Sequence, residues 1–278
     1  MRGNSVIKRV LTVVLAFFLS IVIFVMSVCV VAKATVFNKS FIINCMDKCG
    51  YFSDLDHEIK QSLTDLGYAS GLDEGFSESV FDEVFLKEQT DKYLDAYYSG
   101  ESTVVDTVDF EQKFSAALDN YISDKNIDPD TVNSNSRYVL TKNAAEIFKN
   151  NIKIPMFTTI ANYFYKAQFG LTVIIISSAV LTVLIAVTML LLNKWRHRFY
   201  RNLSYGSLGA TLAVLIIPVA GYISGFASKV NFTQRSAYNL FVTTVNQCQA
   251  GFLLAAAVLV IISLILILLY RRSYNKVK

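Results

Sequence analysis

Four uncharged apolar runs constrain the fold more than any other feature of the sequence. They cover residues 10–32, 169–192, 204–226 and 251–270, and none contains Asp, Glu, Lys or Arg. Crossing about 30 Å of hydrocarbon takes roughly 20 helical residues, and buried helices of soluble proteins rarely stay uncharged that long. The sequence therefore predicts four transmembrane helices, in keeping with a mean hydropathy of +0.41.

The charged residues are divided sharply along the chain. All 22 acidic residues lie between Asp47 and Glu146, and the segment 34–168 also holds 12 of the 26 Lys and Arg residues, which gives it a net charge of −10. The rest of the chain carries 14 basic residues and no acid. This division indicates that the acidic segment and the remaining chain occupy different surroundings.

The basic residues orient the predicted spans. Cytoplasmic segments next to spans carry an excess of Lys and Arg, and three such clusters fall on one side only if both termini are cytoplasmic. The predicted segments are a cytoplasmic N-terminus 1–9, an extracytoplasmic acidic helical domain 33–168, a cytoplasmic link 193–203, an extracytoplasmic loop 227–250 and a cytoplasmic C-terminus 271–278. The residues that set this topology are Arg2, Lys8, Arg9, Lys194, Arg196, Arg198, Arg201, Arg271 and Arg272.

The first apolar run has a second interpretation. A basic start followed by an apolar run and Ala32-Lys33-Ala34 also fits a cleavable signal peptide. The run of 23 residues is longer than the usual apolar region of about 7–15 residues, which favours an uncleaved anchor.

The segment of roughly 135 residues between the first two spans is long enough for a small folded domain. Apolar residues recur in it at helical spacing, and breaks are expected at 71–75, 99–101 and 124–135. The sequence therefore predicts four to six short helices. Their apolar positions are Leu55, Ile59, Leu63 and Leu66; Val80, Phe81, Val84 and Phe85; Phe110, Phe114, Ala117, Leu118 and Tyr121; and Val139, Ala144, Ile147 and Phe148.

The approach to the second span allows two arrangements. Ile154-Pro155 ends a helical segment, because the residue before proline resists the α conformation. From Met156 onward, an apolar pattern leads toward the span at 169–192. This stretch is either a helix lying at the membrane interface or the last packed helix of the domain, continuous with the span.

Several short motifs carry a resemblance. An anchor is followed by Asn38 to Phe41, then Gly50-Tyr51-Phe52, Ser70-Gly71-Leu72 and Tyr93 to Gly100, with three further spans. This order resembles an uncharacterised family of integral membrane proteins of Gram-positive bacteria. The resemblance covers most of the chain and implies a bacterial plasma membrane with a domain facing the cell wall. It implies no activity and no functional residues.

Two acidic motifs show the alternating oxygens of a calcium loop, Asp54-x-Asp56-x-Glu58 and Asp124-x-Asn126-x-Asp128-x-Asp130. Neither has the glycine and the glutamate that an EF-hand loop requires. We interpret the first as the solvated face of a helix and the second as a polar turn. Only two histidines occur, His57 and His197, whereas a catalytic zinc site usually needs three protein ligands and a structural one four. The sequence predicts no metal and no cofactor.

The third span carries small residues at helical spacing: Gly206, Gly209, Ala213, Gly221 and Gly225. Such faces let helices approach closely in lipid. These residues serve helix packing within this bundle, contact between copies of the chain in a homo-oligomer, or contact with a membrane protein partner. Pro218 is expected to bend the same helix.

The four cysteines raise a question of pairing. Cys45 and Cys49 are four residues apart and fall in the predicted outer domain, while Cys248 lies at the outer mouth of the fourth span. These three are either reduced and packed or joined in a disulfide; metal or redox chemistry needs ligands or a C-x-x-C motif that the sequence does not supply. Cys29 lies within the first span and is expected to be inert.

The basic clusters also indicate the partners. Each cluster is short and flanks a span, so the lipid bilayer and anionic lipid headgroups at its inner face are the expected partners, rather than nucleic acid.

Three functions were weighed for the whole chain. The sequence contains no G-x-S-x-G, P-loop, G-x-G-x-x-G or H-E-x-x-H motif and no ionisable residue within a span. It therefore predicts a non-enzymatic protein whose outer domain binds, senses or scaffolds a partner at the cell envelope. The alternative is an accessory or oligomeric pore-forming subunit of a transport system, and an enzyme acting on lipid or wall precursors ranks third.

Overall fold

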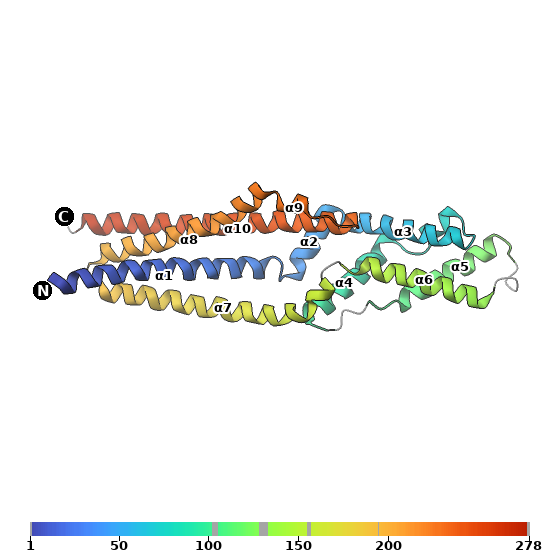
Figure 1. Cartoon of the computed structure of the whole chain (residues 1–278), viewed down its shortest axis with the longest axis horizontal. Coiled ribbons are helices and arrows are strands. Elements are labelled where there is room, and N and C mark those ends of the chain that lie inside the picture. Colours follow the sequence, from blue (N-terminus) through green and yellow to red (C-terminus); the bar gives the residue numbers. More distant parts are fainter. Residues whose placement is uncertain (1, 102–104, 128–132, 155–156, 194, 277–278) are drawn as a thin grey trace. The chain divides into compact units, whose positions relative to one another are not determined.

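The computed structural model describes residues 2–101, 105–127, 133–154, 157–193 and 195–276. Within these ranges the chain is α-helical, with one 3₁₀ helix and no β-strand (Figure 1). It divides into two compact units. The apolar unit comprises Met1–Phe41, Ala167–Val230 and Thr244–Lys278, and the acidic unit comprises Ile42–Lys166 and Asn231–Thr243.

Four long helices supply the apolar unit. They are α1 (Arg2–Ala34), α7 (Phe157–Leu192), α8 (Arg196–Ser224) and α10 (Arg235–Asn275), with the short α9 (Phe226–Lys229) after α8. Each long helix contains a stretch that is long and apolar enough to cross a membrane. The prediction of an all-α chain with four helices of this kind is confirmed.

The helices of the apolar unit pack through small and aliphatic side chains. Ala16 and Leu19 of α1 meet Ile185 and Met189 of α7, and Phe199 of α8 packs against this cluster. A second cluster joins α8 to α10 through Ala210, Val214, Ala256 and Leu259. Within this unit, the start of α1, the end of α7, the start of α8 and the end of α10 lie at the same end (Figure 1).

The acidic unit is built mainly from the segment between the first two spans. Its helices are α2 (Lys39–Cys49), α3 (Tyr51–Ala69), the 3₁₀ helix η1 (Glu74–Ser79), α4 (Glu83–Ser99), α5 (Val108–Asp124) and α6 (Ser134–Ile152). The chain breaks where the sequence predicts: α3 ends at Ala69, α4 at Ser99 and α5 at Asp124. Gly100 ends α4 with φ +77°, a left-handed conformation that favours glycine.

An aromatic core holds these helices together. The ring of Phe110 on α5 stacks on Phe148 of α6 with centroids 4.3 Å apart, and Phe81 meets both rings at 6.0 Å. Phe76 of η1 packs edge-on against Phe114 at 5.4 Å. Aromatic rings bury large areas and favour such stacked and edge-to-face arrangements, so a few phenylalanines join η1, α5 and α6.

Two of the predicted apolar faces are wrong in part. Val80, Phe81, Val84 and Phe85 do not share one helix, because Val80 ends η1 and α4 begins at Glu83. Asp82 caps α4 by accepting a hydrogen bond from the Phe85 N–H at 2.9 Å, and Val84 is left 72% exposed. Val139 of α6 is also exposed. In both helices the aromatic neighbours form the core instead.

The approach to the second span is a single helix. The helix α7 runs from Phe157 to Leu192, and its first turns belong to the acidic unit. Phe164 is buried there against Tyr97, with centroids 4.6 Å apart, and against Tyr98 at 5.2 Å. Of the two predicted arrangements, the packed helix continuous with the span is the one observed. Pro155 and Met156 lie outside the described residues.

The segment 227–250, predicted as an extracytoplasmic loop, is helical over most of its length, because α10 begins at Arg235. Polar residues such as Asn239 and Gln249 interrupt the apolar run, and for this reason the sequence pattern predicts a loop there. Ser236, Ala237 and Leu240 are nevertheless buried, so the helix extends along an amphipathic stretch that an uncharged run does not reveal.

Candidate functional site

The start of α10 is bound by two carboxylates of α3, and all these residues belong to the acidic unit. The first N–H groups of a helix have no partner within the helix. Glu58 Oε1 accepts a hydrogen bond from the backbone N–H of Ser236 at 3.0 Å, and Glu58 Oε2 accepts one from the Ser236 hydroxyl at 2.6 Å. Glu58 therefore caps α10 from another helix, where its negative charge also meets the positive end of the helix dipole.

Three further contacts fix the same turn. Asp54 Oδ2 accepts a hydrogen bond from Asn239 Nδ2 at 2.7 Å, and Gln234 Nε2 donates to Asn151 Oδ1 of α6 at 3.0 Å. Arg235 Nε lies 3.8 Å from Asp54 Oδ1, but the Arg235 side chain is 81% exposed, so this ion pair adds little. We call the group formed by Asp54, Glu58, Ser236 and Asn239 the α3–α10 clamp.

The clamp corrects the interpretation of Asp54-x-Asp56-x-Glu58 as a solvated face. Asp54 and Glu58 are one helical turn apart and point to the same side, where they are half-buried and bound. Asp56 instead pairs with Lys60 at 2.9 Å. Ser236 and Asn239 lie in the first turns of α10, and nothing in the local sequence identifies their distant partners.

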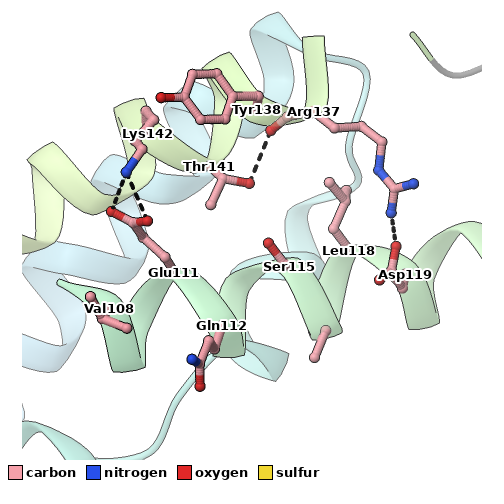
Figure 2. Close-up of a pocket in the computed structure, with 11 residues that line it drawn as sticks. Val108, Glu111, Gln112, Ser115, Leu118, Asp119, Arg137, Tyr138, Thr141 and Lys142 are labelled. Carbon is pink, nitrogen blue, oxygen red and sulfur yellow. Dashed lines mark hydrogen bonds and ion pairs between the residues drawn. The ribbon is translucent and has the colours of Figure 1, made fainter. Parts of the chain in front are cut away.

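A groove between α5 and α6 lies on the acidic unit, with a volume of about 750 Å³. Figure 2 shows an ion pair at each end of it. Lys142 Nζ lies 2.9 Å from both carboxylate oxygens of Glu111 at one end, and Arg137 pairs with Asp119 at the other. The hydroxyl of Ser115 lies between these pairs. Val108, Ala116 and Leu118 add apolar surface, so the lining is mixed, with its charges matched.

The groove residues have ordinary surface electrostatics. The Lys142 ammonium beside Glu111 lowers the pKa of that carboxyl, and a hydrogen bond from Thr107 adds to the effect. Both partners are thus charged at neutral pH. Nothing in this pair resembles an acid or base held near neutrality, which general acid–base catalysis favours.

Four tyrosines of the acidic unit are also unsuited to proton transfer at neutral pH. Burial raises the pKa of Tyr93 to about 12, and burial raises the pKa of Tyr51, Tyr97 and Tyr98 further still. Tyr97 stacks on Phe157 of α7 with centroids 4.6 Å apart. These side chains pack in the core of the acidic unit and against the first turns of α7.

The candidate cysteines are distributed over both units. Cys45 is buried in α2, and Cys49 lies at the end of the same helix with Sγ 3.5 Å from the Met46 carbonyl oxygen. Burial raises the pKa of the Cys49 thiol, which disfavours the reactive thiolate. Cys248 belongs to the apolar unit, where it hydrogen bonds with Thr35. No disulfide joins any of the four cysteines in the structure. A disulfide among Cys45, Cys49 and Cys248, one of the two alternatives, stays a prediction.

Three of the small residues of the third span lie against two neighbouring helices, α1 and α10. A Cβ at Gly206 would come within 3.0 Å of the Ala16 carbonyl oxygen, and one at Gly209 would lie 2.7 Å from Ser20 Oγ, so both face α1. Gly221 faces Gln249 of α10 in the same way. Ala213 is partly buried. Gly225 ends α8 with φ +57°, so its role is a helix terminus rather than close packing.

The predicted topology-setting residues lie near helix ends. Arg2 begins α1, and Lys194 lies outside the described residues. Arg201 is partly buried in α8. The remaining members are exposed: Lys8, Arg9, Arg196, Arg198, Arg271 and Arg272.

Metal and cofactor sites have no support among the described residues. No group of three or more His, Cys, Asp or Glu side chains in them is arranged to hold a metal ion. Asp128 and Asp130 of the second acidic motif lie outside the described residues.

Comparison with protein family models, with curated proteins and with solved structures finds no match.

Proposed function

We propose that this chain is a non-enzymatic integral membrane protein whose acidic helical unit lies outside the plasma membrane and binds, senses or scaffolds a partner at the cell envelope. The observation that carries this proposal is the continuity of α10. This helix starts in the acidic unit at Arg235 and runs without interruption to Asn275 in the apolar unit. A change in the acidic unit would therefore act directly on a candidate span.

The helix α7 supports the same proposal. It begins in the acidic unit, where Phe157 and Phe164 pack on Tyr97, and continues as the second candidate span. Two of the four candidate spans thus start among the helices of the acidic unit. We infer that these two continuous helices couple the acidic unit to the candidate spans.

The groove between α5 and α6 is the surface of the acidic unit that we assign to a partner. It is open, has a mixed polar and apolar lining, and lies within the volume of about 300–1,000 Å³ that is usual for binding sites. The clamp, in contrast, is occupied by the chain itself. The proposal therefore separates a binding surface on α5 and α6 from a connection to the membrane on α3.

The alternative of a transport subunit gains no specific support. Hydroxyl groups within the spans would line a polar path in a pore. Thr182, Thr188 and Thr211 instead donate hydrogen bonds at 2.8–2.9 Å to carbonyl groups of their own helices. Ser207 and Ser263 bond to each other at 2.8 Å in a buried position.

Topology mapping tests the proposal. An alkaline phosphatase fusion at Asp91 is expected to be active because the acidic unit is outside, and a fusion at Arg198 is expected to be inactive. Both fusions must be matched for protein level on a blot. An inactive Asp91 fusion together with an active Arg198 fusion would reverse the orientation and overturn the proposal.

A further inference from the structure

The apolar unit carries basic residues but not one acidic side chain. All 22 acidic residues lie between Asp47 and Glu146, outside the three segments of this unit. The arginines at the first turns of α8 therefore have no acidic side chain within their own unit. Charged groups at a membrane boundary need counter-charges, and anionic lipid headgroups provide them.

One of these arginines differs from the others. Arg201 is partly buried, whereas Arg196 and Arg198 are exposed. Its Nε is enclosed and has no hydrogen-bond partner among the described residues. Nδ1 of His197, one helical turn earlier, is also enclosed and without such a partner. Buried polar atoms usually have partners, so this end of α8 lacks acceptors that the described part of the protein does not supply.

Two contacts place these residues against the last turns of α10. Ser207 of α8 bonds to Ser263 of α10 at 2.8 Å, and ten residues earlier on α8 the His197 ring lies 5.7 Å from the ring of Tyr274. Tyr270 and Tyr274 are neighbours at 6.1 Å. The antiparallel register between these two contacts puts Arg201 level with Tyr270. Tyrosine and arginine together are typical of the headgroup level of a membrane.

We propose that this end of the bundle, formed by Arg201 and His197 of α8 with Tyr270 and Tyr274 of α10, is a binding site for the phosphate of an anionic phospholipid. The Arg201 guanidinium binds the phosphate, since its planar fork matches phosphate oxygens. The two tyrosine rings flank the glycerol backbone. The site is independent of any partner of the acidic unit. Only its location in the inner leaflet of the membrane rests on the orientation proposed above.

Native mass spectrometry of the full chain in mild detergent tests the site. Wild-type protein is expected to retain dioleoyl phosphatidylglycerol over dioleoyl phosphatidylcholine. Arg201→Gln is expected to lower that retention about tenfold, the loss of one charge-assisted contact. Arg201→Lys keeps the charge without the fork and is expected to fall between the two. Circular dichroism checks that each variant remains helical.

Lys229→Gln is the matched control, because it removes one exposed positive charge from α9, at the other end of α8. It is expected to retain the lipid as wild type does. Equal losses for Arg201→Gln and Lys229→Gln would show attraction by overall charge and overturn the site. In a separate arm, inorganic phosphate alone should leave the thermal unfolding temperature unchanged. Stabilisation by phosphate equal to that by the lipid would assign the site to a soluble anion and overturn the proposal.

Discussion

Two helices of the acidic unit carry pairs of carboxylates, and they use them differently. On α3, Asp54 and Glu58 bind neutral donors at the start of α10. On α5, Glu111 and Asp119 bind the cations Lys142 and Arg137 across an open groove. The partner, rather than the carboxylate, decides the role. A carboxylate that satisfies the start of a helix fixes the course of the chain, whereas a surface ion pair shapes a surface at little gain in stability.

The largest expected effect is the loss of the cap. Glu58→Ala leaves the Ser236 N–H and hydroxyl without their partner, so we expect a loss of about 2 kcal/mol in the stability of the acidic unit. Urea unfolding of the full chain in mild detergent, followed by circular dichroism, measures it. Glu111→Ala is the matched control on α5 and should cost about 0.5 kcal/mol. Equal losses of stability in the two variants would contradict the different roles assigned to the carboxylates of α3 and α5.

Coupling energies sharpen the comparison at the next level. A double-mutant cycle with Asp54→Ala and Asn239→Ala should give a coupling of about 1 kcal/mol, since the contact is half-buried and the carboxylate is charged. The cycle with Asp119→Ala and Arg137→Ala should give about 0.5 kcal/mol, because Asp119 is exposed. A larger coupling in the groove than in the clamp would contradict the assignment of structural and surface roles.

The response to pH is a smaller effect, and its sign follows from the lowered pKa of Glu111. A carboxyl whose pKa is lower in the folded state stabilises the fold above its unfolded pKa of about 4.3. This stabilisation is lost as the pH falls through the folded pKa. Glu111→Gln should therefore cost about 0.5 kcal/mol at pH 7 and almost nothing near pH 3. A cost that persists at low pH would show that Lys142 is not the cause.

Salt should give the smallest difference. Raising the ionic strength screens the exposed groove pairs, so the cost of Glu111→Ala should fall toward zero in 1 M NaCl. The partners of Glu58 are a hydroxyl and a backbone N–H, so the cost of Glu58→Ala should change little. Urea unfolding with and without salt compares them. If salt lowered the cost of Glu58→Ala as much as that of Glu111→Ala, Arg235 rather than Ser236 would provide the main contact of the clamp.

The helical architecture could be predicted because it depends on local patterns. Uncharged runs of about 20 residues identify the four candidate spans, and turn residues such as Gly100 mark where helices end. The extension of α10 back to Arg235 could not be predicted in the same way, because Asn239 and Gln249 interrupt the apolar run and the segment gains its burial only from the tertiary fold.

The candidate site residues, too, could be predicted only where a local sequence pattern marks them. Glycines at helical spacing predict close packing, and Gly206 and Gly209 do lie against α1, whereas the left-handed conformation of Gly225 follows from the end of α8. Glu58 and Ser236 are 178 residues apart. Nothing in either local sequence identifies the other, so the carboxylates of α3 resemble any solvated helix face until the fold is known.

Hydrogen exchange at the start of α10 tests the central claim most directly, namely that α3 fixes the beginning of the fourth candidate span. In the full chain in lipid nanodiscs, the amides of residues 236–240 should exchange slowly in wild type and about 30-fold faster in Glu58→Ala, the factor that corresponds to about 2 kcal/mol of local stability. Amides at the start of α7 serve as the internal control and should be unchanged. Equal exchange at 236–240 in the two proteins would contradict the claim.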